Sequence, residues 1–156
     1  MKSLLRIVGA FALIAAFASC SDEEVLDNMV INQITTTELP STNEDGEPWD
    51  SDGTEPDFFI IVKSNGTTVM TSDVMKDTLS TSELNFEGEF PISINNTSDV
   101  LDIDIWESDA GEEDENSDFV GRVSIVPDFY SDQETIIQEK DLEDIRVVIS
   151  ASWEYK

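Results

Sequence analysis

The chain has 156 residues, of which 35 are acidic and 8 are basic, so its formal net charge at pH 7 is −27. This charge excludes nucleic acid as a partner and disfavours adsorption to anionic lipid, because both need a basic surface. The absence of histidine removes the Ser/His/Asp triad and most zinc sites, and we expect a non-enzymatic protein. Carboxylate oxygen, which calcium prefers, is abundant.

The first residues have the form of an export signal. Lys2 and Arg6 supply positive charge, and residues 7–17 form an uncharged apolar run. That run is too short to span a bilayer as a stable helix, but its length suits the apolar region of a signal peptide.

Ala18 and Ser19 precede Cys20, the only cysteine of the chain. Small residues before a lone cysteine resemble the lipobox of a bacterial lipoprotein, although Phe17 stands where Leu is usual. The resemblance implies that residues 1–19 are a cleaved signal peptide and that Cys20 carries a lipid that attaches the protein to a membrane.

The residues after Cys20 are acidic, with Ser-Asp-Glu-Glu at 21–24. Such a stretch resembles the surface-export signal of lipoproteins in some Gram-negative lineages; the alternative is a simple solvated tether. We therefore expect residues 20–28 to be an acylated, acidic tether. We also expect the protein to sit on the outer membrane and face the cell exterior.

The next part of the chain predicts three strands. Residues 29–38 are rich in β-branched side chains and predict the first strand. Residues 40–56 contain many Ser, Asn, Asp, Gly and Pro residues and predict a long loop. Residues 57–63 predict a buried strand, and Asn65-Gly66 predicts a type I′ turn into a partner strand at 67–71.

Four later segments alternate apolar and polar residues, as strands with one buried face do. In the clearest, Leu101, Ile103 and Ile105 oppose Asp102 and Asp104. The four segments are 86–94, 100–106, 119–126 and 145–153. Residues 29–156 therefore predict a single all-β domain, an antiparallel β-sandwich of about 7 to 8 strands.

The order of these segments resembles the C2 domain. The first strand closes in Leu-Pro, the buried strand starts with Asp, and a segment that runs into the fourth strand reads Leu-Asn-Phe-Glu-Gly-Glu-Phe. A later strand leads through an acidic loop into Asp-Phe-Val-Gly, similar to the family's Asp-x-Ile-Gly. These stretches are 36–40, 57–62, 84–90, 101–109 and 118–121. The resemblance implies a C2-like interaction module.

The family binds calcium between two loops at one end of the sandwich. Carried over to this chain, the ligands are Asp50 or Asp52, Asp57, Glu107, Asp109 and Asp118. Independently of the family, strand ends are fixed in space by their sheets, so carboxylates there can converge. Clustered carboxylates repel unless a cation lies among them. We therefore expect a Ca²⁺ site, and a purely solvated acidic loop is the alternative.

Four further residues have specific predictions. Trp106 is expected in the core between the sheets, and Trp153 is expected to pack. Trp49 either lines a groove or anchors its loop. Thr78, in Asp77-Thr78-Leu79, resembles an O-glycan acceptor of some Gram-negative surface proteins.

The loop tips carry no Lys, Arg or large apolar residue, so we expect a protein or glycan partner at the cell surface. Two alternatives stay open. One is a metal-free structural or adhesin-like sandwich, and the other is a carbohydrate-binding accessory lipoprotein that uses Trp49.

Overall fold

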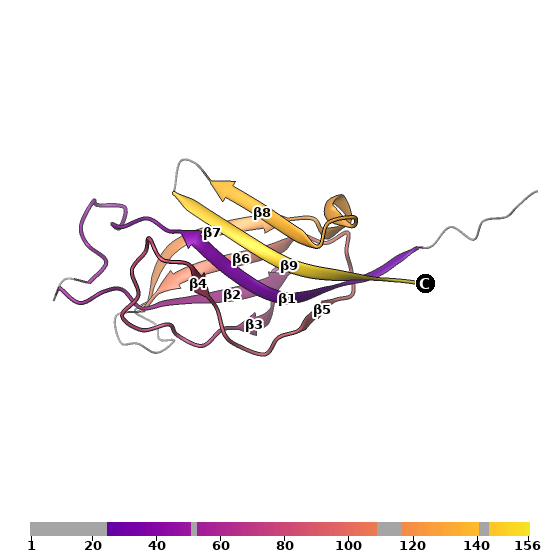
Figure 1. The fold of residues 1–156 in the computed structure, drawn as a ribbon, viewed down its shortest axis with the longest axis horizontal. Helices are drawn as coiled ribbons and strands as arrows, with labels where there is room; N and C mark the ends of the chain where they lie inside the picture. The colour runs from indigo at the N-terminus through magenta and orange to yellow at the C-terminus, as the bar shows by residue number, and fades with distance from the viewer. Residues whose placement is uncertain (1–24, 51–52, 109–116, 141–143) are drawn as a thin grey trace, which may run out of the picture.

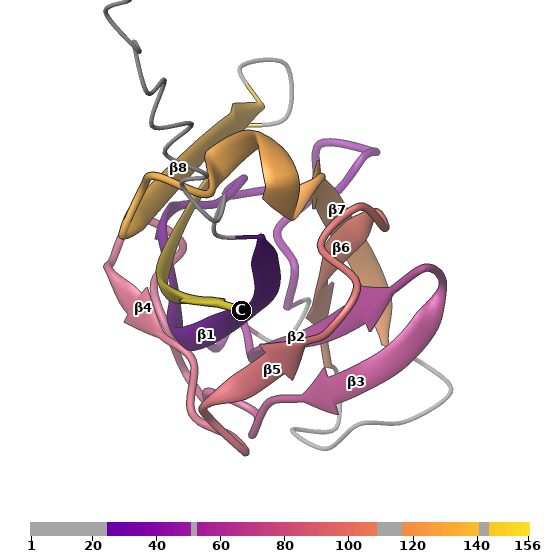
Figure 2. The ribbon, with the colours of Figure 1, turned by 90° about the vertical axis from the view of Figure 1, so that its right-hand side faces the viewer.

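A computed structural model gives the fold and describes residues 25–50, 53–108, 117–140 and 144–156. Two antiparallel sheets pack face to face (Figures 1 and 2). The strands in these ranges are β1 (Leu26–Glu38), β2 (Phe58–Ser64), β3 (Thr67–Thr71), β4 (Leu84–Asn85), β5 (Ile92–Ile94), β6 (Leu101–Glu107), β7 (Asp118–Ile125), β8 (Thr135–Lys140) and β9 (Ile145–Tyr155), with a 3₁₀ helix η1 (Pro127–Tyr130). The predicted antiparallel β-sandwich is confirmed.

One sheet has the order β4-β1-β9-β8, with β5 also paired to β1, and the other has the order β3-β2-β6-β7. β1 and β9 are paired from Leu26 opposite Tyr155 to Glu38 opposite Arg146. Val25 and Lys156 continue this ribbon with two backbone hydrogen bonds of 3.1 and 2.9 Å. No helix in the described ranges is long and apolar enough to cross a membrane.

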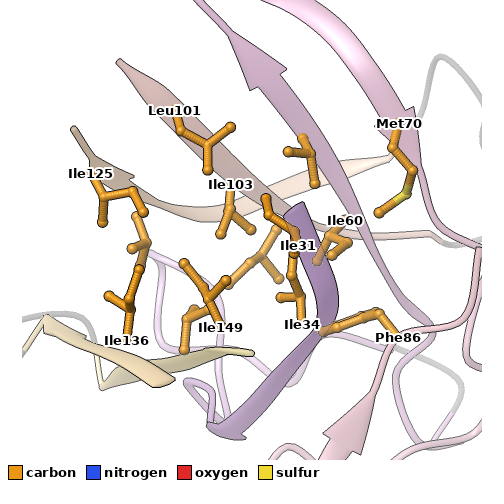
Figure 3. Close-up of a cluster of buried hydrophobic side chains, with 14 of the residues drawn as sticks. Ile31, Ile34, Ile60, Met70, Phe86, Leu101, Ile103, Ile125, Ile136 and Ile149 are labelled. Atoms are coloured by element: carbon orange, nitrogen blue, oxygen red, sulfur yellow. The ribbon is translucent and has the colours of Figure 1, made fainter. Parts of the chain in front are cut away.

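The core lies between the inner faces of the two sheets (Figure 3). In β9 every second residue from Ile145 to Ala151 is buried, and in β6 Leu101, Ile103 and Ile105 are buried. Side chains from both sheets meet there, including Ile31, Ile34, Ile60, Ile103, Ile125, Ile136 and Ile149. Burying one such side chain stabilises the fold by about 1.5–3 kcal/mol, so the alternating pattern drives the pairing of the sheets.

The predicted turn between β2 and β3 is confirmed. Asn65 and Gly66 have φ angles of 48° and 76°, and Ser64 pairs with Thr67 across them. Two consecutive positive φ angles define the type I′ turn, whose twist matches that of the paired strands.

Three strand predictions need correction. The first strand begins at Leu26 instead of Met29. Of the predicted strand 86–94, only β5 at 92–94 is a strand; β4 ends just before that range, and Gly88 and Pro91 lie between β4 and β5. Proline has no N–H for a strand ladder, and Gly88 lies close to the backbone of β3 and the residue after it. β8 was not predicted at all, although it pairs with β9 along its whole length.

The prediction that Trp106 lies between the sheets is wrong. Period-two counting along β6 puts Trp106 on the outer face with Asp102 and Asp104. There its ring meets the ring of Phe119 on β7 edge to face, with centroids 5.2 Å apart. Trp153, as predicted, packs against the core.

Candidate functional site

Three strand ends meet at one end of the four-stranded sheet, which we call the acidic pole. β2 begins there, β6 ends there and β7 begins there (Figure 1). Glu107 pairs in register with Phe58 on one side and with Asp118 on the other. The backbone N–H of Ser108 donates to the carbonyl of Asp57 over 2.9 Å. The sheet thus brings Asp57, Glu107 and Asp118 onto adjacent strands, although up to 61 positions separate them in the sequence numbering.

The three acidic residues of the pole have different surroundings. Asp57 is half-buried, and its Oδ1 accepts a 2.6 Å hydrogen bond from the backbone N–H of Asp77. Glu107 is fully buried at the end of the inner face of β6, whereas Asp118 is exposed. A carboxylate can accept several bonds, so the bond to Asp77 does not prevent Asp57 from meeting a cation.

Residues 40–50 form a loop beside the pole. Trp49 is buried, and its Nε1 donates to the carbonyl of Pro40 over 2.8 Å. The same residue lines a groove of about 380 Å³ together with Phe119 and Arg122 of β7. Trp49 therefore does both things that the sequence suggested, since it anchors its loop and lines a groove. Asp50 follows it and is half-buried.

The described residues supply only part of a cation site. Among them, no group of three or more acidic side chains is placed to hold a metal ion. Two of the predicted ligands, Asp52 and Asp109, lie outside the described residues, as does the predicted lipid attachment at Cys20. The donor chemistry at the pole suits calcium, because it is carboxylate oxygen, but the strand ends alone do not make a complete ligand set.

Thr78 lies in the loop between β3 and β4 and is half-buried. Its backbone N–H donates to the carbonyl of Pro56 over 2.9 Å. Its hydroxyl lies 3.2 Å from the same oxygen and 3.3 Å from the carbonyl of Met75. These contacts tie the loop to the start of β2, and O-glycosylation of Thr78 stays a prediction.

An ionic cluster on the outer face of the four-stranded sheet was not predicted from the sequence. Asp104 has no exposed surface and binds two cations, Lys63 Nζ at 2.7 Å and Arg122 through Nε and through Nη2 at 2.9 Å. Burial raises the pKa of Asp104, but the hydrogen bonds and charges of Arg122 and Lys63 outweigh burial and hold it below its ordinary value. The carboxylate is therefore ionised and locked between β2 and β7.

No protein-family model and no curated protein sequence matches the chain. Among solved structures, one described as a C2 domain superposes with a TM-score of 0.54 and 10% sequence identity, over 82% of this chain and 98% of the other. A human GIVD cytosolic phospholipase A2, solved with methyl gamma-linolenyl fluorophosphonate and terbium chloride, gives a TM-score of 0.54 at 14% identity. That match covers 85% of this chain but 18% of the phospholipase. At these identities the likeness concerns the fold, and the chain has the C2-like form of the antiparallel β-sandwich.

Proposed function

We propose that this chain is a non-enzymatic interaction module, carried on the outer membrane by a lipid on Cys20 and facing the cell exterior. Its C2-like sandwich binds Ca²⁺ at the acidic pole and presents that pole to a protein or glycan partner. The observation that supports the calcium part is the register of β2, β6 and β7, which brings the backbone positions of Asp57, Glu107 and Asp118 to neighbouring strand ends. The proposed attachment to the membrane rests on the lipobox resemblance around Cys20.

Two arguments favour a cation at the pole. The strong net negative charge of the chain raises the local concentration of divalent cations around any carboxylate group. The phospholipase complex contains terbium chloride, and terbium, like calcium, is a hard cation that takes oxygen ligands. A bound ion would neutralise the pole and fix loop 40–56 relative to the start of β7.

Calcium titration of the full chain tests whether it binds the metal. Extracellular modules bind calcium with Kd values of roughly 0.1–1 mM. At about ten times Kd, the ion stabilises the fold by about 1.4 kcal/mol, so the melting temperature rises with calcium and returns with chelator. Calorimetry with Asp57→Asn and Asp109→Asn should show weaker binding. Asp99→Asn is the matched control, because it makes the same change just before β6 begins, at the other end of that strand.

If the melting temperature is the same with calcium, magnesium and chelator, the calcium proposal fails. The chain would then be a metal-free structural or adhesin-like sandwich. The lipid anchor is tested separately, by following membrane fractionation and incorporation of labelled fatty acid for Cys20→Ala. Surface display is tested by protease treatment of intact cells. Loss of calcium binding and loss of anchoring are thus independent outcomes.

A sugar partner at Trp49 is disfavoured by the structure around that residue. Trp49 is only 8% exposed, and its Nε1 is committed to the carbonyl of Pro40. Stacking on a sugar needs an open ring face, and a ring this deeply buried offers little of one.

A further inference from the structure

A second hollow lies at the end of the sandwich remote from the acidic pole. Trp153 and Tyr155, near the end of β9, pair with Met29 and Leu26 at the start of β1. Figure 2 views the molecule from this end, with the C-terminus toward the viewer. The hollow has a volume of about 660 Å³, which is within the range of small-molecule sites.

Two aromatic residues line one part of this hollow, and both have their polar atoms committed elsewhere. Trp153 Nε1 donates to the carbonyl of Gln133 over 2.8 Å. The hydroxyl of Tyr155 donates to the carbonyl of Ser131 over 2.8 Å. Residues 153 and 155 lie on the same side of the strand. The rings are therefore held in place, and they offer carbon surface to a ligand; Tyr155 is 48% exposed.

Apart from Ala151, the other lining residues are polar, and none of them carries a positive charge. Asn32, Ser150 and Ser152 offer an amide and hydroxyls from β1 and β9, and Asp132 and Glu134 offer carboxylates from the segment after η1. None of the described residues that line the hollow is basic. Anionic ligands such as phosphates and acidic sugars are disfavoured, because two carboxylates would repel them.

We propose that this hollow is a binding site for a neutral saccharide, and we call it the Trp153–Tyr155 site. A pyranose has C–H groups on its faces and hydroxyls around its rim. The C–H groups pack on the negative faces of aromatic rings, and the hydroxyls exchange hydrogen bonds with carboxylates, amides and hydroxyls. A quaternary ammonium ion is the competing ligand, but a cage for it surrounds the cation with ring faces. This open hollow has only two aromatic residues among the residues that line it.

The test uses the full chain in a detergent without a sugar headgroup. The probes are cellohexaose, xylohexaose, laminarihexaose and mannohexaose, with tetragalacturonate and choline chloride as charged comparisons, each followed by calorimetry up to about 10 mM. We expect at least one neutral hexasaccharide to bind and both charged probes to fail. Tyr155→Ala should weaken that binding about tenfold, whereas Tyr155→Phe, which keeps the ring, should retain most of it.

Phe129→Ala is the matched control, because Phe129 is an aromatic residue that is 78% exposed and does not line the hollow. Glu134→Ala gives a second probe of the site that leaves both rings in place, in case Tyr155→Ala lowers the melting temperature. Three results would overturn the proposed site. They are no binding of any neutral hexasaccharide, binding of choline that depends on Tyr155, and equal losses of saccharide affinity for Tyr155→Ala and Phe129→Ala. The calcium and lipid tests above are unaffected by each of these results.

Discussion

Replacing Asp104 by asparagine should destabilise the domain more than any other single acidic-to-amide change on the outer face of its sheet. The carboxylate is fully buried and binds Lys63 and Arg122. Breaking a buried ion pair from one side costs about 3–5 kcal/mol, chiefly because the remaining charge is stranded. Here the side chains of Lys63 and Arg122 are 24% and 45% exposed. Water can therefore solvate the two cations after the change and offset part of the destabilisation. The expected loss is about 2–3 kcal/mol.

Urea denaturation, followed by far-ultraviolet circular dichroism, measures this loss directly. For a domain of this size, about 2–3 kcal/mol also lowers Tm by roughly 8 °C. Asp102→Asn is the matched control, because Asp102 lies two positions away on the same face and accepts a 2.6 Å hydrogen bond from Ser124 Oγ. The contact between Asp102 and the Arg122 guanidinium is 3.9 Å long, so the loss of stability on this change should be below about 1 kcal/mol. Equal losses of unfolding free energy for the two variants would refute the argument that burial of Asp104 makes its ion pairs costly to break.

Three further outcomes follow from the fold. Ile103→Ala should cost about 3 kcal/mol by chemical denaturation, because Ile103 is fully buried, and Val100→Ala, at a position 45% exposed, should cost little. Gly66→Ala should cost about 1 kcal/mol, because Gly66 has a φ of +76°; an unchanged midpoint would contradict the type I′ turn. The pKa of Asp104 lies below its ordinary value of 3.8, so its contribution is fully present above that pH and declines as the pH falls toward the folded pKa. The stability difference between the wild type and Asp104→Asn should therefore shrink in acid, and a difference that grows would have the wrong sign.

Period-two alternation carried most of the fold prediction. It placed β6 and β9 with the correct buried faces, and the Asn65-Gly66 pair located the hairpin. β8 was not predicted because this six-residue edge strand buries only one apolar side chain, Ile136, and so shows no clear alternating pattern. Trp106 was predicted between the sheets, although counting along β6 puts it on the outer face with Asp102 and Asp104.

The proximity of three predicted site residues at strand ends could be inferred from the sequence, whereas their binding of a metal stays a prediction. Asp57, Glu107 and Asp118 could be grouped because each stands at the limit of a strand with a clear apolar pattern. The cluster around Asp104 could not be found in this way, since Lys63 is 41 positions away and Arg122 is 18 positions away. Only the register of β2, β6 and β7 makes them neighbours. The Trp153–Tyr155 site was hidden for a similar reason, because it depends on how the segment after η1 folds back on β9.

The β1–β9 ribbon also sets the reach of the molecule. β1 has 13 residues, which corresponds to a length of about 40 Å between the Val25 end and the acidic pole. Five peptide steps separate Cys20 from Val25 and extend to about 17 Å at most. If Cys20 carries the proposed lipid, the pole cannot descend tip-first onto the bilayer in which that lipid is inserted. On the proposed function, a partner bound at the pole would therefore lie beside or above that bilayer, on a neighbouring molecule or on another cell.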